Sequence, residues 1–173
     1  MLRPWCDADL PSFAEINADP EVMAYMPARL TRAESDDQAA YIRRHFEDHG
    51  FGMFALERLS QFIGFVGLDH VRDAMPFAPA VQIAWRLHRA HWGQSYASEA
   101  AREVLRFAFE ALKLDKVVSY TTPENLRSRA VMAAIGLNRV IGGDFDHPAL
   151  AEGHPLRRHV LYEAKAPHVP MSR

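Results

Sequence analysis

Residues 81–114 constrain the fold of this chain more than any other part of the sequence. They begin with an alternating strand pattern, Val81 to Leu87, and continue through a short basic link and a turn of small residues into a long amphipathic helix. Such a turn at a helix start leaves backbone N–H groups free, and the helix dipole adds partial positive charge there. The segment therefore predicts a site for a ligand that carries phosphate groups.

The remaining patterns predict a mixed α/β (α+β) domain. The expected helices are 7–18, 21–26, 31–48, 94–112 and 126–135, and the expected strands are 51–57, 62–69, 81–87, 116–121, 137–141 and 158–163. This order predicts a twisted, largely antiparallel sheet flanked by helices, with one right-handed βαβ crossover through the long helix. The crossover brings the turn at 92–97 beside the end of strand 116–121. Ligands of open α/β sheets bind at such carboxyl ends of strands, so we expect the site there.

Length and charge narrow the class of protein. The 173 residues are expected to form a single domain, 1–173, in which about the last eight residues are frayed. The net charge of -2 produces no field that would attract nucleic acid, and no apolar run approaches the length needed to span a membrane. The single cysteine, Cys6, excludes an intrachain disulfide and favours a reducing compartment. We therefore expect a cytoplasmic protein with no nucleic-acid or membrane partner.

Two short motifs point to a particular chemistry. The first is Trp92-Gly93-Gln94-Ser95-Tyr96-Ala97-Ser98-Glu99-Ala100, and the second is Asn125-Leu126-Arg127-Ser128 on a helix that ends in Gly136-Leu137. Together they resemble the GNAT superfamily of acyl-CoA-dependent N-acetyltransferases, and within it the branch of ribosomal-protein N-terminal (Rim-type) acetyltransferases. The specific motif residues lie within 85–137, while the order of elements resembles that family over most of the chain.

This resemblance implies a GNAT-like fold in which the crossover carries the pyrophosphate loop, and it implies acetyl-CoA as cosubstrate. Backbone groups at the end of the strand would hold the pantetheine arm, backbone N–H groups of the loop would hold the pyrophosphate, and Asn125 would hold the arm from the opposite side. The implied cofactor-binding residues are Trp85, Arg86, Leu87, Trp92, Gly93, Gln94, Ser95, Tyr96, Ala97, Ser98, Asn125 and Ser128. Ser128 would also protonate the leaving thiolate.

The chain departs from the family pattern at three positions. Ser95 replaces a loop glycine, although a non-glycine residue tolerates a positive φ poorly. Met132 stands where many members have a catalytic tyrosine, which favours Ser128 as the acid. Gln82 stands where many members of this branch have a glutamate that could serve as base, and a glutamine cannot take a proton.

The chemistry of acetyl transfer suggests the remaining roles. The N–H of Leu87, at the end of a strand, is a candidate donor to the oxyanion. Glu57, Asp69 and His70 lie at strand ends, and His70 needs the smallest pKa adjustment to act as the base. We therefore expect His70 or a water relay to take the proton of the amine.

The sequence leaves several alternatives open. The amine acceptor can be a protein N-terminus, an amino acid or a small amine. A catalytically silent acyl-CoA sensor or scaffold is the rival from another class, whereas ATP binding is disfavoured because no P-loop lysine follows the turn. We expect no metal site in the Asp- and His-containing loop 142–156, whose spacing matches no standard ligand pattern and which is better read as a lid or an interface. A homodimer is compatible with the sequence.

Overall fold

The computed structural model describes residues 1–167, so most of the predicted C-terminal fraying falls on residues 168–173, outside the described part. The helices are α1 (Leu10–Ala18), α2 (Arg32–His49), α3 (Tyr96–Glu110) and α4 (Leu126–Ala134), with 3-10 turns η1 (Asp7–Asp9) and η2 (Arg89–His91). The strands are β1 (Leu2–Arg3), β2 (Met53–Arg58), β3 (Gln61–His70), β4 (Val81–Leu87), β5 (Lys116–Thr121), β6 (Asn138–Arg139), β7 (Phe145–Asp146) and β8 (Arg158–Lys165). Within residues 1–167, no helix is both long and apolar enough to cross a membrane.

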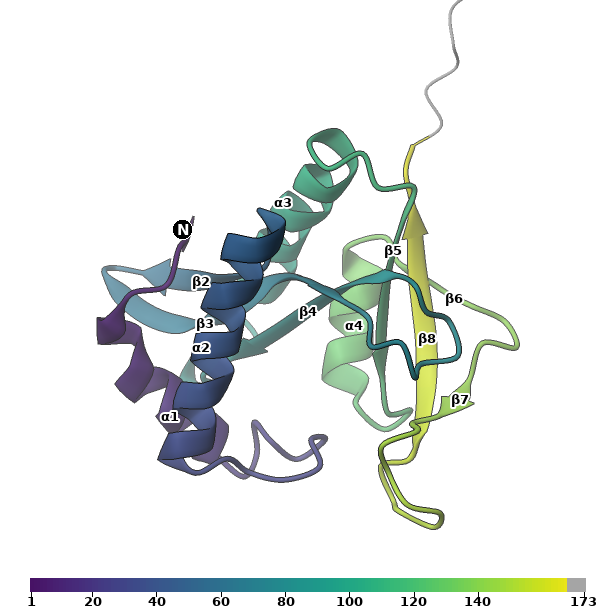
Figure 1. The fold of residues 1–173 in the computed structure, drawn as a ribbon, viewed down its shortest axis with the longest axis horizontal. Helices are drawn as coiled ribbons and strands as arrows, with labels where there is room; N and C mark the ends of the chain where they lie inside the picture. Colours follow the sequence, from purple (N-terminus) through teal and green to yellow (C-terminus); the bar gives the residue numbers. More distant parts are fainter. Residues whose placement is uncertain (168–173) are drawn as a thin grey trace, which may run out of the picture.

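The strands form one mixed sheet in the order β1-β2-β3-β4-β5-β8-β6, and β7 pairs with β8. Pairing is antiparallel except between β4 and β5, which run parallel on either side of the crossover through α3. In Figure 1, β4 and β5 diverge toward their carboxyl ends, and α4 lies beside the gap between their ribbons. The predicted largely antiparallel sheet with a single βαβ crossover is confirmed.

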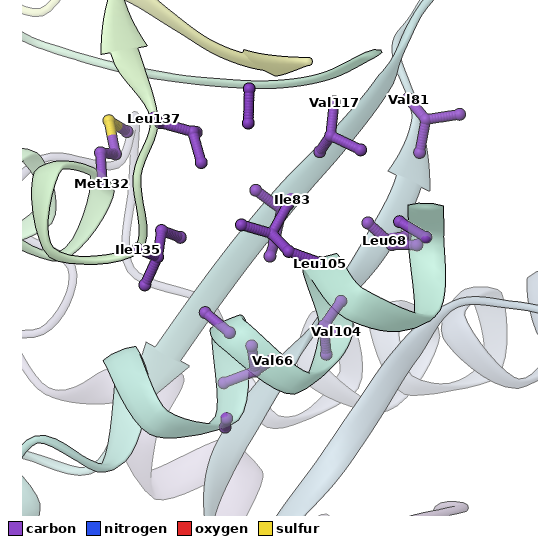
Figure 2. Close-up of a cluster of buried hydrophobic side chains, with 14 of the residues drawn as sticks. Val66, Leu68, Val81, Ile83, Val104, Leu105, Val117, Met132, Ile135 and Leu137 are labelled. Carbon is purple, nitrogen blue, oxygen red and sulfur yellow. The ribbon is translucent and has the colours of Figure 1, made fainter. Parts of the chain in front are cut away.

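Helices cover both faces of the sheet. The larger core lies between the sheet and helices α3 and α4, where Ile83 and Val117 meet the inward stripe of α3 and the end of α4 (Figure 2). The smaller core lies on the opposite face, where Phe13 of α1 and Ile42 of α2 pack against Phe65. The sheet is thus the middle layer of three, as expected for strands with apolar residues on both faces.

Local signals account for the helix boundaries. Thr31 and Glu34 form the expected capping box at the start of α2, and Gly50 ends the helix in the left-handed conformation. The helix predicted for 21–26 is wrong, because this segment forms turns in which Asp19 caps the N–H groups of Glu21 and Val22.

Two short strands were not predicted from the sequence. β1 pairs with β2 at the N-terminal edge, and β7 pairs with β8 inside the segment expected to be an irregular loop. Each has two residues, which is too short for periodicity to reveal. Phe145 of β7 is buried against Phe77 and Tyr120, with ring centroids 5.0 and 5.7 Å apart, so part of loop 142–156 belongs to the core.

Candidate functional site

The backbone of β4 turns unpaired groups toward β5. His88 N–H donates to Ile63 O at 2.9 Å, so the opposed pair Gly64 and Leu87 is of the non-hydrogen-bonded type. Because pairs alternate along an antiparallel ladder, Arg86 bonds to β3, whereas Trp85 and Leu87 direct their N–H and C=O groups away from β3. Of the three residues expected to offer backbone groups to the arm of the cosubstrate, the structure therefore presents Trp85 and Leu87.

Pairing between β4 and β5 stops early. The two strands share one paired position, Gln82 with Val118, and Ser119 Oγ then donates to Ile83 O at 2.9 Å. Beyond that bond, no strand of residues 1–167 pairs with Trp85 and Leu87 on this side, and of their backbone groups only Leu87 O is engaged, by the Trp92 indole. An extended chain with amide groups can pair with β4 at this position, and the pantetheine arm of acetyl-CoA has this character.

The loop after β4 presents a second set of free N–H groups. Gly93 and Ser95 both adopt left-handed conformations, with φ of 72° and 62°. Glu99 N–H makes the first hydrogen bond of α3, to Ser95 O, so the N–H groups of residues 96–98 have no acceptor within the helix. Residues 93–95 are exposed, which leaves this helix start accessible to an anion.

Ser95 occupies the conformation that the family glycine would favour. A left-handed conformation carries a steric penalty for a non-glycine residue, so Ser95 is strained in this loop. Ser98 supports this shape, because its hydroxyl donates to Ser95 O at 2.9 Å. The Ser98 side chain is therefore committed to the loop, while its backbone N–H stays free.

Trp92 joins the loop to the strand and to α4. Its indole Nε1 donates to Leu87 O at 3.0 Å, and the Arg127 guanidinium lies 4.3 Å from the centroid of its ring. These contacts bring the first turn of α4 next to the pyrophosphate loop. Arg129, in contrast, is held away by hydrogen bonds to Pro123 O and Tyr162 Oη.

Asn125 connects the end of β5 to the start of α4. Its Oδ1 accepts from Ser128 N–H at 3.2 Å, and its Nδ2 donates to Thr121 Oγ1 at 2.9 Å. Asn125 is thus the N-cap of α4, as its type predicts. Ser128 is partly buried in the first turn, and no group of residues 1–167 hydrogen-bonds its hydroxyl.

Several basic side chains surround the start of α3, and they differ in whether a carboxylate already pairs with them. Arg89 is neutralised by ion pairs with Glu21 and Asp19. Arg58 stacks over the Tyr96 ring at 5.5 Å and, like Arg127, has no carboxylate within 4 Å among the described residues. His91 has its pKa lowered by burial and by the charges of His88 and Arg58, which keeps it neutral at neutral pH. Arg58 and Arg127 are therefore the cations best placed to meet phosphates.

The structure does not bring His70 together with Leu87 and Ser128. Since β3 is antiparallel to β4, the last residue of β3 lies opposite Val81, at the start of β4. That is six positions from Leu87, roughly 20 Å along the strand. His70 contacts His45 instead, with 3.2 Å between His70 Nδ1 and His45 Nε2. Glu57 is likewise engaged, in an ion pair with Arg3.

A polar network beneath β4 was not expected from the sequence. Arg86 Nη1 donates to Asn17 Oδ1 at 2.5 Å and to Gln38 Oε1 at 3.3 Å, and Asn17 Nδ2 donates to Ser35 Oγ at 2.8 Å. Burial lowers the pKa of Arg86 to about 10, so its guanidinium stays charged at neutral pH. The network fastens α1 and α2 to the strand that carries the site, and its residues are too far apart in sequence to form a motif.

The two aspartates of loop 142–156 form ion pairs with arginines. Asp144 pairs with Arg139, and Asp146 pairs with Arg157 and Arg158. These carboxylates are therefore engaged by arginines rather than arranged around a cation.

Comparison with known proteins identifies the family of the chain. The profile described as "Acetyltransferase (GNAT) domain" matches residues 1–138. The FsC-acetyl coenzyme A-N(2)-transacetylase of Aspergillus fumigatus is 33% identical over 135 residues, which cover 73% of this chain and 57% of that protein, so the chain spans little more than half of this relative. An uncharacterized N-acetyltransferase of Bacillus subtilis, YnaD, is 25% identical over 140 residues, covering 80% of this chain and 79% of that protein.

Solved structures show the same fold. An acetyltransferase from Agrobacterium tumefaciens is 27% identical to this chain, with a TM-score of 0.74. The match covers 94% of this chain and 88% of that protein. Mycobacterium smegmatis RimJ, solved in complex with CoA-disulfide, is 22% identical, with a TM-score of 0.76. The match covers 99% of this chain and 84% of that protein. Rim-type enzymes are thus among the structural neighbours, together with other acetyltransferases. From its motifs, its fold and these relatives, the chain belongs to the GNAT family of N-acetyltransferases, which take their acetyl group from acetyl-CoA.

Proposed function

We propose that this protein transfers the acetyl group of acetyl-CoA to a primary amine by direct attack in a ternary complex. The observation that carries the proposal is the set of unpaired N–H groups on Trp85 and Leu87, next to the free N–H groups at the start of α3. The first set suits the amide-containing arm of the cosubstrate, and the second set suits its pyrophosphate. Bound acetyl-CoA supplies an activated thioester.

The protein provides orientation, oxyanion stabilisation and a proton. Holding the two reactants in line can supply ~7–11 kcal/mol in favourable systems. The N–H of Leu87, or that of Trp85, donates to the thioester carbonyl oxygen as negative charge develops there. Ser128, whose hydroxyl is free, protonates the departing thiolate, and Asn125 holds the turn that carries it.

No residue at this site is assigned as a base, and this favours one class of acceptor. An α-amino group has a pKa of about 8, so a useful fraction is neutral at neutral pH, whereas a lysine-like amine has a pKa of about 10.4. His70 lies at the far end of β4, and Gln82 cannot accept a proton. The proposed acceptor is therefore an α-amine, at a protein N-terminus or on an amino acid, which loses its proton to water. The proposed setting is the cytoplasm, where the free thiol of Cys6 stays reduced.

A thiol-release assay with a panel of amines tests the reaction. We expect CoA release that depends on the amine and is faster for α-amines than for alkyl amines of higher pKa. Saturable acetyl-CoA binding without release for any amine would instead identify an acyl-CoA sensor and contradict the proposed transfer.

Variants of Asn125 test the site itself. Asn125→Ala should weaken acetyl-CoA binding measured by calorimetry, because it removes both the cap of α4 and the amide group. Asn125→Asp is the matched control, since it keeps the cap acceptor and lacks the amide N–H groups. If Asp restores full affinity, the role of Asn125 is to hold the turn; if neither variant changes affinity, the assignment of Asn125 is wrong.

A further inference from the structure

Three histidines gather at the end of α2, outside the site described above. His45 and His49 are four residues apart, so both side chains lie on one face of the last turn of the helix. His70, the last residue of β3, lies against them. One ring nitrogen of each residue lies within 4.8 Å of those of the other two. The His49 ring centroid is 4.5 Å from that of His45 and 4.5 Å from that of His70.

A hydrogen bond to the backbone orients the His45 ring in the way that is typical of metal-binding histidines. Its Nδ1 lies 2.9 Å from Phe51 O, and a backbone carbonyl accepts only from a protonated nitrogen. The lone pair of neutral His45 is then on Nε2, the nitrogen that faces the cluster. Histidines that bind metals in proteins typically donate their second N–H to a carbonyl or carboxylate in this way.

That lone pair faces a carboxylate oxygen and a ring nitrogen of His70. His45 Nε2 lies 3.2 Å from His70 Nδ1 and 3.1 Å from Asp69 Oδ1. The carboxylate is itself held in place, because Tyr41 Oη donates to the same oxygen at 3.0 Å. The Nε2 lone pair and the carboxylate oxygen are both acceptors, and at 3.1 Å they repel each other unless a positive charge lies between them. A bound cation would satisfy the arrangement.

The spacing suits a tetrahedral ion. Zinc–nitrogen bonds of about 2.05 Å in a tetrahedron separate the ligand atoms by about 3.3 Å. The separations of 3.2 and 3.1 Å around His45 Nε2 are close to this value, and a modest movement of the exposed His49 side chain would complete the set.

Access and the local field favour a cation as well. His45 is buried, with 6% of its surface exposed, whereas His49 and His70 are open to solvent and leave an entry path. The cluster is at the C-terminal end of α2, where the helix dipole is negative. Phe51 packs against His45 and His70, with ring centroids 5.3 and 5.1 Å away, and limits their movement.

We propose that His45, His49 and His70 form a binding site for a divalent transition-metal ion of the zinc class, with Asp69 or a water molecule as the fourth ligand. Imidazole nitrogens with a carboxylate suit this class of ion, rather than calcium or magnesium, which prefer oxygen ligands. The site would tie the end of α2 to the end of β3, and it does not depend on acetyl transfer.

Cobalt is a suitable spectroscopic probe for the test. Untagged, metal-free protein is titrated with Co²⁺, followed by its visible absorption, and Zn²⁺ is then added to displace the cobalt. We expect one equivalent to bind with the intense absorption of a tetrahedral site and with micromolar or tighter affinity. His49→Ala and His70→Ala should each weaken binding at least tenfold, and Asp69→Asn should weaken it less. The exposed positions of His49 and His70 are chosen because their loss leaves the core intact.

His147→Ala is the matched control, because it removes a histidine from another pair, in which the centroids of His147 and His159 are 5.2 Å apart. This variant should bind the ion as the wild type does, and circular dichroism confirms that each variant is folded. Wild-type affinity no better than that of the His49 and His70 variants would overturn the proposal and leave the cluster as a hydrogen-bond network that binds no metal. Loss of binding in the His147 variant alone would overturn it too.

Discussion

At the scale of single residues, the proposed chemistry uses a few groups that have no hydrogen-bond partner among residues 1–167. Within the described part of the chain, the N–H groups of Trp85 and Leu87 have no partner strand, and the Ser128 hydroxyl has no hydrogen-bond partner. Ser95, in contrast, keeps an unfavourable left-handed conformation at the helix start. Free hydrogen-bonding groups and local strain occur together where a ligand is expected to bind.

Ser128→Ala should lower kcat about 100-fold, because the thiolate then leaves without a positioned acid. The affinity for acetyl-CoA should change much less, since the cap made by Asn125 uses the backbone of Ser128. Steady-state kinetics with calorimetry separates the two effects. Ser128→Thr keeps a hydroxyl and should retain more of the rate; a loss of affinity as large as the loss of rate would contradict the acid role.

Ser95→Gly should raise the free energy of unfolding by about 1 kcal/mol, because glycine adopts the left-handed conformation without the steric penalty. Denaturant unfolding measures the change. Ser98→Gly is the control, since it places glycine inside α3 and removes the hydroxyl that bonds to Ser95 O, so stability should fall. Equal losses in both variants would show that Ser95 is not strained.

At the scale of elements, the proposed site lies where β4, α3 and α4 meet. Trp92 holds this junction through its bond to Leu87 O and its contact with Arg127. The other face of β4 is fastened to α1 and α2 through Arg86, Asn17 and Gln38. Both sides of the strand are thus fixed by side chains from other elements, while its backbone stays open toward β5.

Two neighbouring arginines of α4 should have separable effects. Arg127→Ala should weaken acetyl-CoA binding about 3-fold to 10-fold, with a smaller effect at high salt, because a partly exposed charge near phosphates is lost. Arg129→Ala should instead lower stability by about 1–2 kcal/mol, since it removes hydrogen bonds to Pro123 O and Tyr162 Oη. Calorimetry and thermal unfolding of both variants test this contrast. A loss of affinity confined to Arg129→Ala would reverse the assignment.

At the scale of the whole molecule, the N-terminal strand β1 forms one edge of the sheet. Arg3 of β1 forms a bidentate ion pair with Asp9, at 2.7 and 2.6 Å, and a second ion pair with Glu57 of β2. Burial alone would raise the pKa of Asp9, but hydrogen bonds from Arg3 and from Cys6 N–H outweigh it and hold that pKa below its ordinary value. Deprotonated Asp9 therefore contributes to the stability of the folded chain.

The sign of the pH effect follows from that lowered pKa. The contribution of Asp9 is fully present above the ordinary pKa of an aspartate, about 3.9, and is lost as the pH falls through the lower folded-state value. Asp9→Asn should lower the free energy of unfolding at neutral pH by about 2 kcal/mol, and the difference from wild type should shrink in acid. Unfolding curves at several pH values test this, with the exposed Asp7→Asn as control. A difference that is independent of pH would contradict the role of Asp9.

The sequence by itself determined the local elements and the chemistry expected of them. β4 and β5 have the predicted bounds, and α2 begins at the predicted capping box, because alternation, amphipathic spacing and caps act over a few residues. The two motifs also identified the family. Tertiary structure decided the direction of the Trp85 and Leu87 N–H groups and the position of His70. It also gave Arg127 and Arg129 different contacts, one with the Trp92 ring and the other with Pro123 O and Tyr162 Oη. These features depend on strand register and on contacts between segments far apart in the chain.

The histidine cluster shows the same division. The spacing of His45 and His49 is visible in the sequence, but four-residue spacing on a helix is common and names no third ligand. Only the antiparallel pairing of β3 with β4, and the crossing of α2 over the sheet (Figure 1), bring His70 to them. Local sequence specifies which helices and strands form. Which side chains converge depends instead on how the sheet and its helices pack, and that packing is set by many contacts between residues far apart in the sequence.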